Sequence, residues 1–193
     1  MSFIKGKVAF VGDTNVGKTS LIYKYNNCTE TIENTIASTS IPCTVDYKGT
    51  PVTFNVWDTA GQDDYRCLVP MFVKGAQIAV IVFDITNPTS FEHVNDWLGF
   101  LDENCNVNKI FLVSNKVDLP SNVSLETITE YAKEHQMKHF MTSALNGQNV
   151  DVLFYSIAEQ IQTGNQPQPS PDQKQDAQVE IKPANTEKKH CSC

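Results

Sequence analysis

The chain has 193 residues, of which 40% are hydrophobic, and a formal net charge of −7 at pH 7. This length is enough for one domain with a proper core and too short for two, so we expect a single domain followed by a tail. The negative charge leaves no basic surface excess to hold a phosphate polymer, so nucleic acid is disfavoured as a partner.

The six cysteines, at positions 28, 43, 67, 105, 191 and 193, follow neither a disulfide-scaffold nor a zinc-site spacing. Reduced thiols in the cytosol are the simplest interpretation. The apolar stretch near the N-terminus is shorter than that of a signal peptide. No segment approaches the roughly 20 apolar residues of a membrane span, so we expect any membrane attachment to be covalent or through a partner.

Short apolar runs alternate along the chain with stretches of helical periodicity, which predicts a doubly wound α/β fold. Helical apolar stripes are expected to face the core: one runs from Phe91 to Leu101 and includes Trp97, one runs from Ile128 to His135, and one from Val150 to Ile161. The expected parallel strands are residues 8–11, 53–57, 78–83, 110–113 and 139–142.

One hairpin breaks this alternation. Residues 41–47 and 52–57 flank Lys48-Gly49-Thr50, where glycine supplies the turn, and Pro42 would confine the first strand to a sheet edge. We therefore expect a mostly parallel six-stranded sheet with one antiparallel edge strand and helices on both faces.

A change of composition at Thr163 predicts the domain boundary. Residues 1–162 form the expected domain, whereas residues 163–193 are polar up to the final cysteines and cannot bury enough surface to offset their ordering entropy. We expect this tail to be disordered.

The first motif that indicates chemistry follows the strand at 8–11 and precedes a helical stretch. Backbone N–H groups at its glycines can form an anion nest, while a lysine and a helix N-terminus add positive charge for phosphates. A threonine hydroxyl suits Mg²⁺. The pattern G-x-x-x-x-G-K-[ST] predicts a nucleoside triphosphate site, with a glycine-rich turn as the structural alternative. Its residues are Gly12, Asp13, Thr14, Asn15, Val16, Gly17, Lys18 and Thr19, followed by Ser20.

A second motif, Trp57 to Gln62, begins at the end of the strand at 53–57. Asp58 would hold Mg²⁺ directly or through water. The N–H of Gly61 would approach the γ-phosphate, and Gln62 has an acceptor and a donor with which to orient an attacking water. A strand-terminal Asp, a turn Gly and an exposed Gln are ordinary features singly, but their order and spacing favour the site.

A third motif, Asn115-Lys116-Val117-Asp118, follows the buried run at 110–113, at the strand end where doubly wound sheets place ligands. A carboxylate there can accept the N1 and N2 hydrogens of guanine, which adenine does not offer in that arrangement. Asp118 is therefore the residue expected to set base choice, with a plain strand-to-loop turn as the alternative.

These motifs resemble those of the Ras superfamily. The similarity continues through Tyr65-Arg66, residues 68–72, Gly75-Ala76 and residues 83–86, which are most similar to Rab proteins. The resemblance covers roughly residues 5–162 and implies a P-loop NTPase small G domain. It implies a GTPase that binds GTP or GDP with Mg²⁺, hydrolyses GTP slowly and regulates vesicle traffic.

The resemblance also implies roles for further residues. Thr35 resembles the switch I threonine that completes the Mg²⁺ shell beside Thr19 and Asp58, although the segment before it is two residues shorter than is usual in Rabs and Ala37 stands where glycine is common. Ser143-Ala144-Leu145 resembles Ser-Ala-Lys, whose alanine N–H reads the guanine O6. Leu145 replaces a stacking stem by a shorter one, so we expect at most a modest loss of affinity.

The chain ends in Cys191-Ser192-Cys193, which resembles the Rab signal for geranylgeranyl groups on both cysteines. The alternatives are an inert thiol pair and a His-Cys-Cys metal fragment with too few ligands for a closed site. The resemblance implies a monomer on the cytoplasmic face of an endomembrane, exchanging with the cytosol. Its implied partners are an exchange factor, a GTPase-activating protein, a GDP-dissociation inhibitor, a prenylation escort, and effectors that bind switches I and II.

Two other classes of function stay open at this point. One is a non-hydrolysing nucleotide-binding scaffold, in which Thr14, the short switch I or Asp63-Asp64 in place of Glu-Arg disables turnover. The other is an ATP-dependent kinase built on the same phosphate loop. A kinase would prefer adenine, whereas the run from Asn115 to Asp118 favours guanine.

Overall fold

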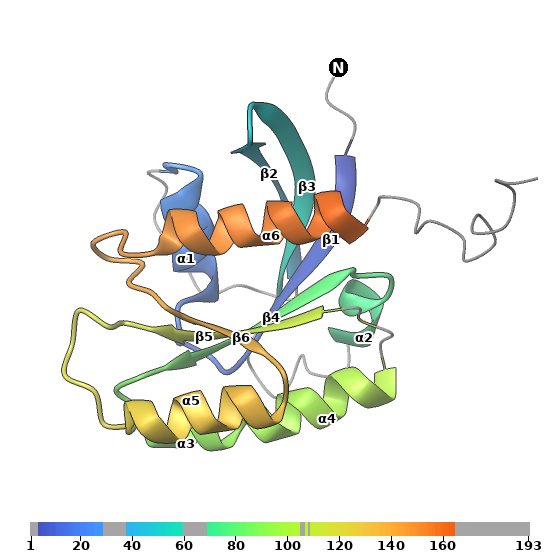
Figure 1. The fold of residues 1–193 in the computed structure, drawn as a ribbon. Helices are drawn as coiled ribbons and strands as arrows, with labels where there is room; N and C mark the ends of the chain where they lie inside the picture. Colours follow the sequence, from blue (N-terminus) through green and yellow to red (C-terminus); the bar gives the residue numbers. More distant parts are fainter. Residues whose placement is uncertain (1–3, 29–37, 60–68, 105–106, 108, 165–193) are drawn as a thin grey trace, which may run out of the picture.

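The computed structural model describes residues 4–28, 38–59, 69–104, 107 and 109–164, with the side chains of residues 4 and 5 left out. Within these ranges the chain forms one sheet covered by helices on both faces (Figure 1). None of the described helices is long and apolar enough to cross a bilayer.

The sheet has six strands in the order β2-β3-β1-β4-β5-β6. All neighbouring strands pair in parallel except β2 and β3, which pair antiparallel. This confirms the expected mixed sheet with one antiparallel edge strand. The strands are β1 (Ile4–Val11), β2 (Ser38–Tyr47), β3 (Thr50–Thr59), β4 (Ile78–Asp84), β5 (Lys109–Asn115) and β6 (Lys138–Met141).

The hairpin between β2 and β3 has a two-residue turn. Lys48 and Gly49 both have positive φ, 52° and 77°, as a type I′ turn requires. The Asp46 carboxylate accepts a hydrogen bond from the Gly49 N–H (2.8 Å). Thr50, expected in the turn, instead pairs with Tyr47 as the first residue of β3. Pro42 lies on the edge strand β2, as predicted.

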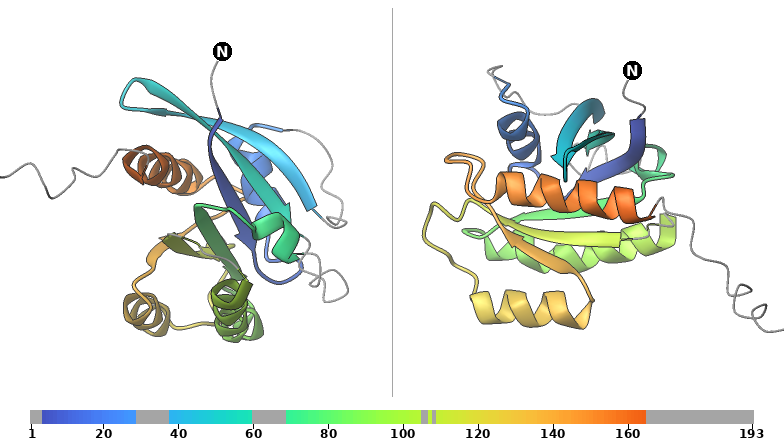
Figure 2. Two further views of the ribbon diagram at one scale, coloured as in Figure 1. Left: turned by 90° about the vertical axis from the view of Figure 1, so that its right-hand side faces the viewer. Right: turned by 45° about the horizontal axis from the view of Figure 1, so that its top comes forward.

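Helices α1 and α6 cover one face of the sheet, and α3, α4 and α5 cover the other (Figure 1, Figure 2). Helix α6 ends at Gly164, slightly beyond the expected boundary at residue 162. The helices are α1 (Lys18–Tyr25), α2 (Val69–Val73), α3 (Pro88–Glu92), α4 (Val94–Asn104), α5 (Leu125–Glu134) and α6 (Val150–Gly164).

The structure confirms that two of the predicted stripes face the core and differs from the prediction at one residue in each. The stripe from Phe91 to Leu101 spans two helices that meet at His93, which keeps right-handed dihedrals (φ −68°, ψ −11°), so the apolar period passes through the junction. His135 was expected to face the core but caps the C-terminus of α5 and is exposed.

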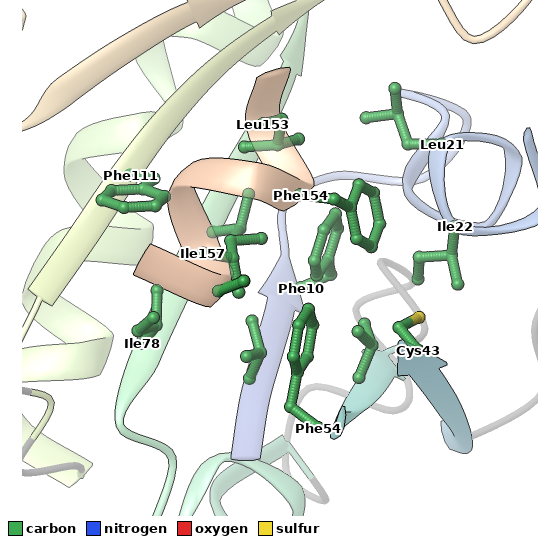
Figure 3. Close-up of a cluster of buried hydrophobic side chains, with 14 of the residues drawn as sticks. Phe10, Leu21, Ile22, Cys43, Phe54, Ile78, Phe111, Leu153, Phe154 and Ile157 are labelled. Atoms are coloured by element: carbon green, nitrogen blue, oxygen red, sulfur yellow. The ribbon is translucent and has the colours of Figure 1, made fainter. Parts of the chain in front are cut away.

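The core beneath α1 and α6 is built around Phe154 (Figure 3). Its ring is fully buried and stacks on the ring of Tyr25 at 4.0 Å between centroids; the rings of Phe10 and Phe54 lie 6.0 Å and 6.5 Å away. Such aromatic pairs contribute beyond the area that they bury. Phe154 therefore joins α6 to α1 and to two strands.

We expect Phe154→Ala to lower the free energy of unfolding by about 3–5 kcal/mol, because it leaves a cavity among these rings. Urea-induced unfolding measures the change. The matched control is Val152→Ala on the same helix, where the side chain is 53% exposed. The control should change stability by less than about 0.5 kcal/mol. Similar losses in both variants would contradict the central role of Phe154.

Candidate functional site

The predicted motifs meet at one edge of the sheet. The loop after β1, the end of β3, the loop after β5 and the loop after β6 all lie at the carboxyl ends of parallel strands. Ligands bind at this edge in open α/β sheets. Hydrogen bonds between these loops bring the sequence motifs together.

Backbone conformation and close packing both require glycine at two positions of the phosphate loop. Gly12 has φ 137° and Gly17 has φ 96°, conformations that L side chains rarely adopt. A Cβ on Gly12 would overlap the backbone oxygen of Val82, and a Cβ on Gly17 would overlap the side-chain amide of Asn115. The glycines, expected from the sequence to let phosphates approach, are therefore also required by the close packing of the loop itself.

Lys18 bends back over this loop. Its side chain is 6% exposed, and its Nζ donates hydrogen bonds to the backbone oxygens of Gly12 (2.8 Å) and Asp13 (2.7 Å). Burial lowers the pKa of Lys18 to about 8, against the opposing effect of the Asp58 and Asp13 carboxylates. The ammonium is thus still largely protonated at neutral pH.

Thr19 and Asp58 join the phosphate loop to β3. The Thr19 hydroxyl donates to Asp58 Oδ2 at 2.5 Å, and Asp58 is buried at the end of the strand. Hydroxyl and carboxylate oxygens fit Mg²⁺, which is usually held by one or two carboxylates together with substrate phosphates. Among the described residues there is no group of three or more His, Cys, Asp or Glu side chains that could hold a metal ion.

Ser20 lies beside Thr19 in the first turn of α1 and is half-buried. Thr14 is half-buried in the loop, whereas Asn15 is exposed with φ 64°. Val16 has a buried side chain, so only its backbone can face a ligand. All of these predicted residues therefore lie in or next to the same loop.

Asn115 connects the phosphate side to the base side. Its buried side-chain amide donates to the backbone oxygen of Val16 (2.8 Å), and its Oδ1 accepts from the Ala144 N–H (3.2 Å) and the Thr142 hydroxyl (3.3 Å). Sequence reasoning placed Asn115 in a base-reading motif but missed this structural role. The Ala144 N–H, expected to read guanine O6, here donates to Asn115.

Asp118 is exposed, and Ser143 orients its carboxylate. The buried Ser143 hydroxyl donates to Asp118 Oδ1 at 2.5 Å, and the Val117 N–H donates to the Thr142 oxygen at 3.1 Å. These bonds bring the run from Asn115 to Asp118 and the run from Ser143 to Leu145 together. The Leu145 side chain is 77% exposed, and its backbone oxygen accepts from Lys24 Nζ at 3.3 Å.

Lys116 has a partner that sequence reasoning missed. Its Nζ lies 2.6 Å from Asp84 Oδ2 at the end of the neighbouring strand β4. Burial alone would raise the pKa of Asp84, but hydrogen bonds from Lys116 and Thr86 outweigh it and lower that pKa. Asp84 is the last residue of a buried apolar strand, and this position was the feature of the sequence that could have indicated a charged partner for it. Asp13 also has unforeseen partners, because its side chain contacts His93 and Trp97.

Several predicted site residues fall outside the described part of the chain. They are the proposed catalytic Gln62, the switch residues Thr35 and Gly61, and the terminal Cys191 and Cys193.

The chain is similar to known proteins over the part that contains these motifs. The model of the Ras family matches residues 7–163. The Ras-related proteins RABF2a and RABF2b of Arabidopsis thaliana are 38% and 37% identical to the chain over 163 residues, which cover 82% of the chain and 82% of each relative. The Ras-related protein Rab-5A of Dictyostelium discoideum is 35% identical over 192 residues, 97% of the chain and 94% of that protein.

These matches confirm the resemblance to Rab proteins and the small G domain fold, and they agree with a guanine nucleotide rather than an ATP-dependent kinase activity. No observation in the described residues favours the non-hydrolysing scaffold. The chain therefore belongs to the Ras family as a Rab small GTPase, which binds and hydrolyses GTP in membrane trafficking.

Proposed function

We propose that this Rab GTPase binds GTP and GDP across the four loops at the carboxyl edge of the sheet. We also propose that the conformation of its surface loops differs between the two nucleotides. The observation that carries the proposal is the buried Asn115 amide, which hydrogen-bonds to the loops after β1 and β6 at once. A nucleotide spanning phosphate and base subsites needs such a fixed separation between them.

The phosphates would lie in the loop from Gly12 to Lys18, against its backbone N–H groups and the N-terminus of α1. Lys18 would exchange its bond to the Gly12 carbonyl for bonds to the β- and γ-phosphates, because a phosphate is the stronger acceptor, and would keep its bond to the Asp13 carbonyl with the third of its donors. Thr19, Asp58 and Thr35 would hold Mg²⁺. The ion would supply neutralisation of charge on the transferred phosphoryl group.

The base would be read by Asp118, whose carboxylate accepts from guanine N1 and N2. The Ser143 hydroxyl already orients this carboxylate, so little ordering remains to be done on binding. Asn115 and Lys116 support the loop. The Ala144 N–H would share its present bond to Asn115 with guanine O6, and the Leu145 stem would cover the base.

Hydrolysis would depend on a placed water and on charge neutralisation. Gln62 would orient the water that attacks the γ-phosphorus, while Lys18 compensates the charge that develops on the phosphate oxygens. The intrinsic rate should be slow and rise with an activating protein, and Thr14, bulkier than the small residues of the family at this position, should slow it further. Thr35 and Gly61 would hold switches I and II on GTP and release them after hydrolysis.

The membrane anchor would be two geranylgeranyl groups, on Cys191 and Cys193. One lipid chain alone binds reversibly, so two are needed for a stable anchor. Residues 163–193 would be the tether, and the site of action the cytoplasmic face of an endomembrane. An exchange factor, a GTPase-activating protein, a GDP-dissociation inhibitor and a prenylation escort would serve the cycle of a monomer.

We expect Gln62→Leu to lower GTP hydrolysis at least about tenfold, because the attacking water loses its hydrogen-bonding partner. Affinity for GDP should stay within about a few fold, because no role in base or β-phosphate binding is assigned to Gln62. Single-turnover hydrolysis of bound GTP measures the rate. Gln160→Leu on α6 makes the same chemical change away from the site and should hydrolyse normally. Equal rates in Gln62→Leu and the unmodified protein would remove Gln62 from the mechanism.

We expect Asp118→Asn to exchange guanine preference for xanthine. The amide can donate to the xanthine 2-oxo group but cannot accept two hydrogens from guanine, so GDP affinity should fall by about 10² or more. Competition between GDP and xanthosine diphosphate measures the preference. Asp102→Asn, an exposed position on α4, is the matched control. Unchanged guanine preference in Asp118→Asn would end the base-reading assignment.

We expect removal of the last three residues to make the protein wholly soluble in cells, because no cysteine is left at the terminus for lipid. The double variant Cys191→Ser, Cys193→Ser should do the same, and each single variant should bind membranes weakly and reversibly. Membrane flotation measures the distribution. Cys28→Ser, at an exposed cysteine of the domain, is the control and should leave it unchanged. Persistent membrane association without both terminal cysteines would refute the lipid anchor.

A further inference from the structure

The side chain of Asp13 points from the phosphate loop toward the start of α4. Its Oδ2 lies 2.6 Å from His93 Nδ1, and its Oδ1 accepts a hydrogen bond from Trp97 Nε1 at 2.9 Å. His93 and Trp97 are one helical turn apart, and the backbone N–H of Trp97 donates to the backbone oxygen of His93 at 3.0 Å. Their side chains therefore share one helix face, and the two together engage both oxygens of one carboxylate.

The backbone of the same residue is bound to the phosphate-binding lysine. The Asp13 carbonyl accepts from Lys18 Nζ at 2.7 Å. The Asp13 carboxylate also acts electrostatically on Lys18, since it is among the groups that raise the pKa of that lysine against the effect of burial. Asp13 is therefore a link between α4 on one side and Lys18 on the other.

The position of this carboxylate needs an explanation, because a negative charge in a phosphate loop opposes the binding of an anion. Hydrogen bonds from an indole N–H and an imidazole, both on the α4 side, bind this carboxylate and compensate its charge. Trp97 is almost fully buried, and its N–H is a donor that needs a partner in the interior. The contact thus satisfies both groups.

We propose that Trp97 and His93 are positioning residues for nucleotide retention. Through Asp13 they fix the orientation of the peptide whose carbonyl binds Lys18, and so hold the phosphate loop and its lysine in the geometry that binds phosphates. This role goes beyond the proposed contacts of the nucleotide and rests on them for the function of the loop. It also gives Trp97 a polar task in addition to its place in the apolar stripe of α4.

The test is the rate at which fluorescently labelled GDP leaves the full-length protein in the presence of Mg²⁺. Trp97→Phe keeps an aromatic ring and removes the N–H, His93→Gln removes the imidazole at a side chain that is 46% exposed, and Asp13→Ala removes the acceptor. Each of the two α4 variants should release GDP about tenfold faster or more, as expected for losing a hydrogen bond to a charged group. Asp13→Ala also removes a negative charge from the loop, so it serves as the background for the double variants.

The decisive measurement is the double variant. If Trp97 acts through Asp13, Trp97→Phe should change the release rate by less than about twofold when Asp13→Ala is already present. The same should hold for His93→Gln, which tests the proposal at a half-exposed position should Trp97→Phe fail to fold. Glu103→Gln, an exposed charge on α4, should release GDP at the normal rate.

Additive effects in the double variants would overturn the inference, because they would show that Trp97 and His93 act by packing alone. Normal release from both single α4 variants would overturn it as well. Lys18→Ala in the same assay separates this result from the proposed function. Normal GDP binding without the Lys18 ammonium would count against the phosphate loop itself, whereas weak binding there together with additive effects counts only against the link to α4.

Discussion

The buried side-chain amide of Asn115 is the interaction on which the geometry of the site depends. It donates to Val16 in the phosphate loop and accepts from the loop after β6, so it fixes the distance between the groups proposed to bind phosphate and base. Its Nδ2 also occupies the space that a Cβ on Gly17 would take. The glycine in one motif is therefore required by the asparagine in another, 98 positions later in the chain, and the two motifs function as one unit.

The architecture explains why polar groups gather at this edge. Strand β4 is buried along its whole length, and β1 and β5 carry long buried runs, because helices cover both faces of the sheet. A buried polar side chain in the middle of such strands would lack partners and cost free energy. At the carboxyl ends of the strands, the loops supply hydrogen-bonding partners. Buried polar side chains such as Asp58, Asp84 and Asn115 lie at these ends.

Local patterns in the sequence were enough to predict the sheet and the motifs. Apolar runs placed the strands, and the edge position of Pro42 followed from its missing N–H. The junction at His93 was not predictable in this way, since the apolar period continues through it. Contacts between distant positions were also missed. Asp13 and His93 are 80 positions apart, and the periodicity of apolar residues does not indicate a contact over that distance. Trp97 was correctly predicted to be buried, but burial alone did not indicate the acceptor of its N–H.

Helix α1 shows how a change of side chain on the base side can be accommodated. It begins at the phosphate loop, and near its other end Lys24 donates to the backbone oxygen of Leu145. A Cβ on Gly147 would lie 3.0 Å from Lys24 Cε, so the loop after β6 packs closely against the lysine stem. These contacts use the backbone oxygen of Leu145 and a glycine, so they do not involve the Leu145 side chain. In the proposed nucleotide complex, the leucine would change what covers the base, while Asn115 and Ser143 organise the path of the loop.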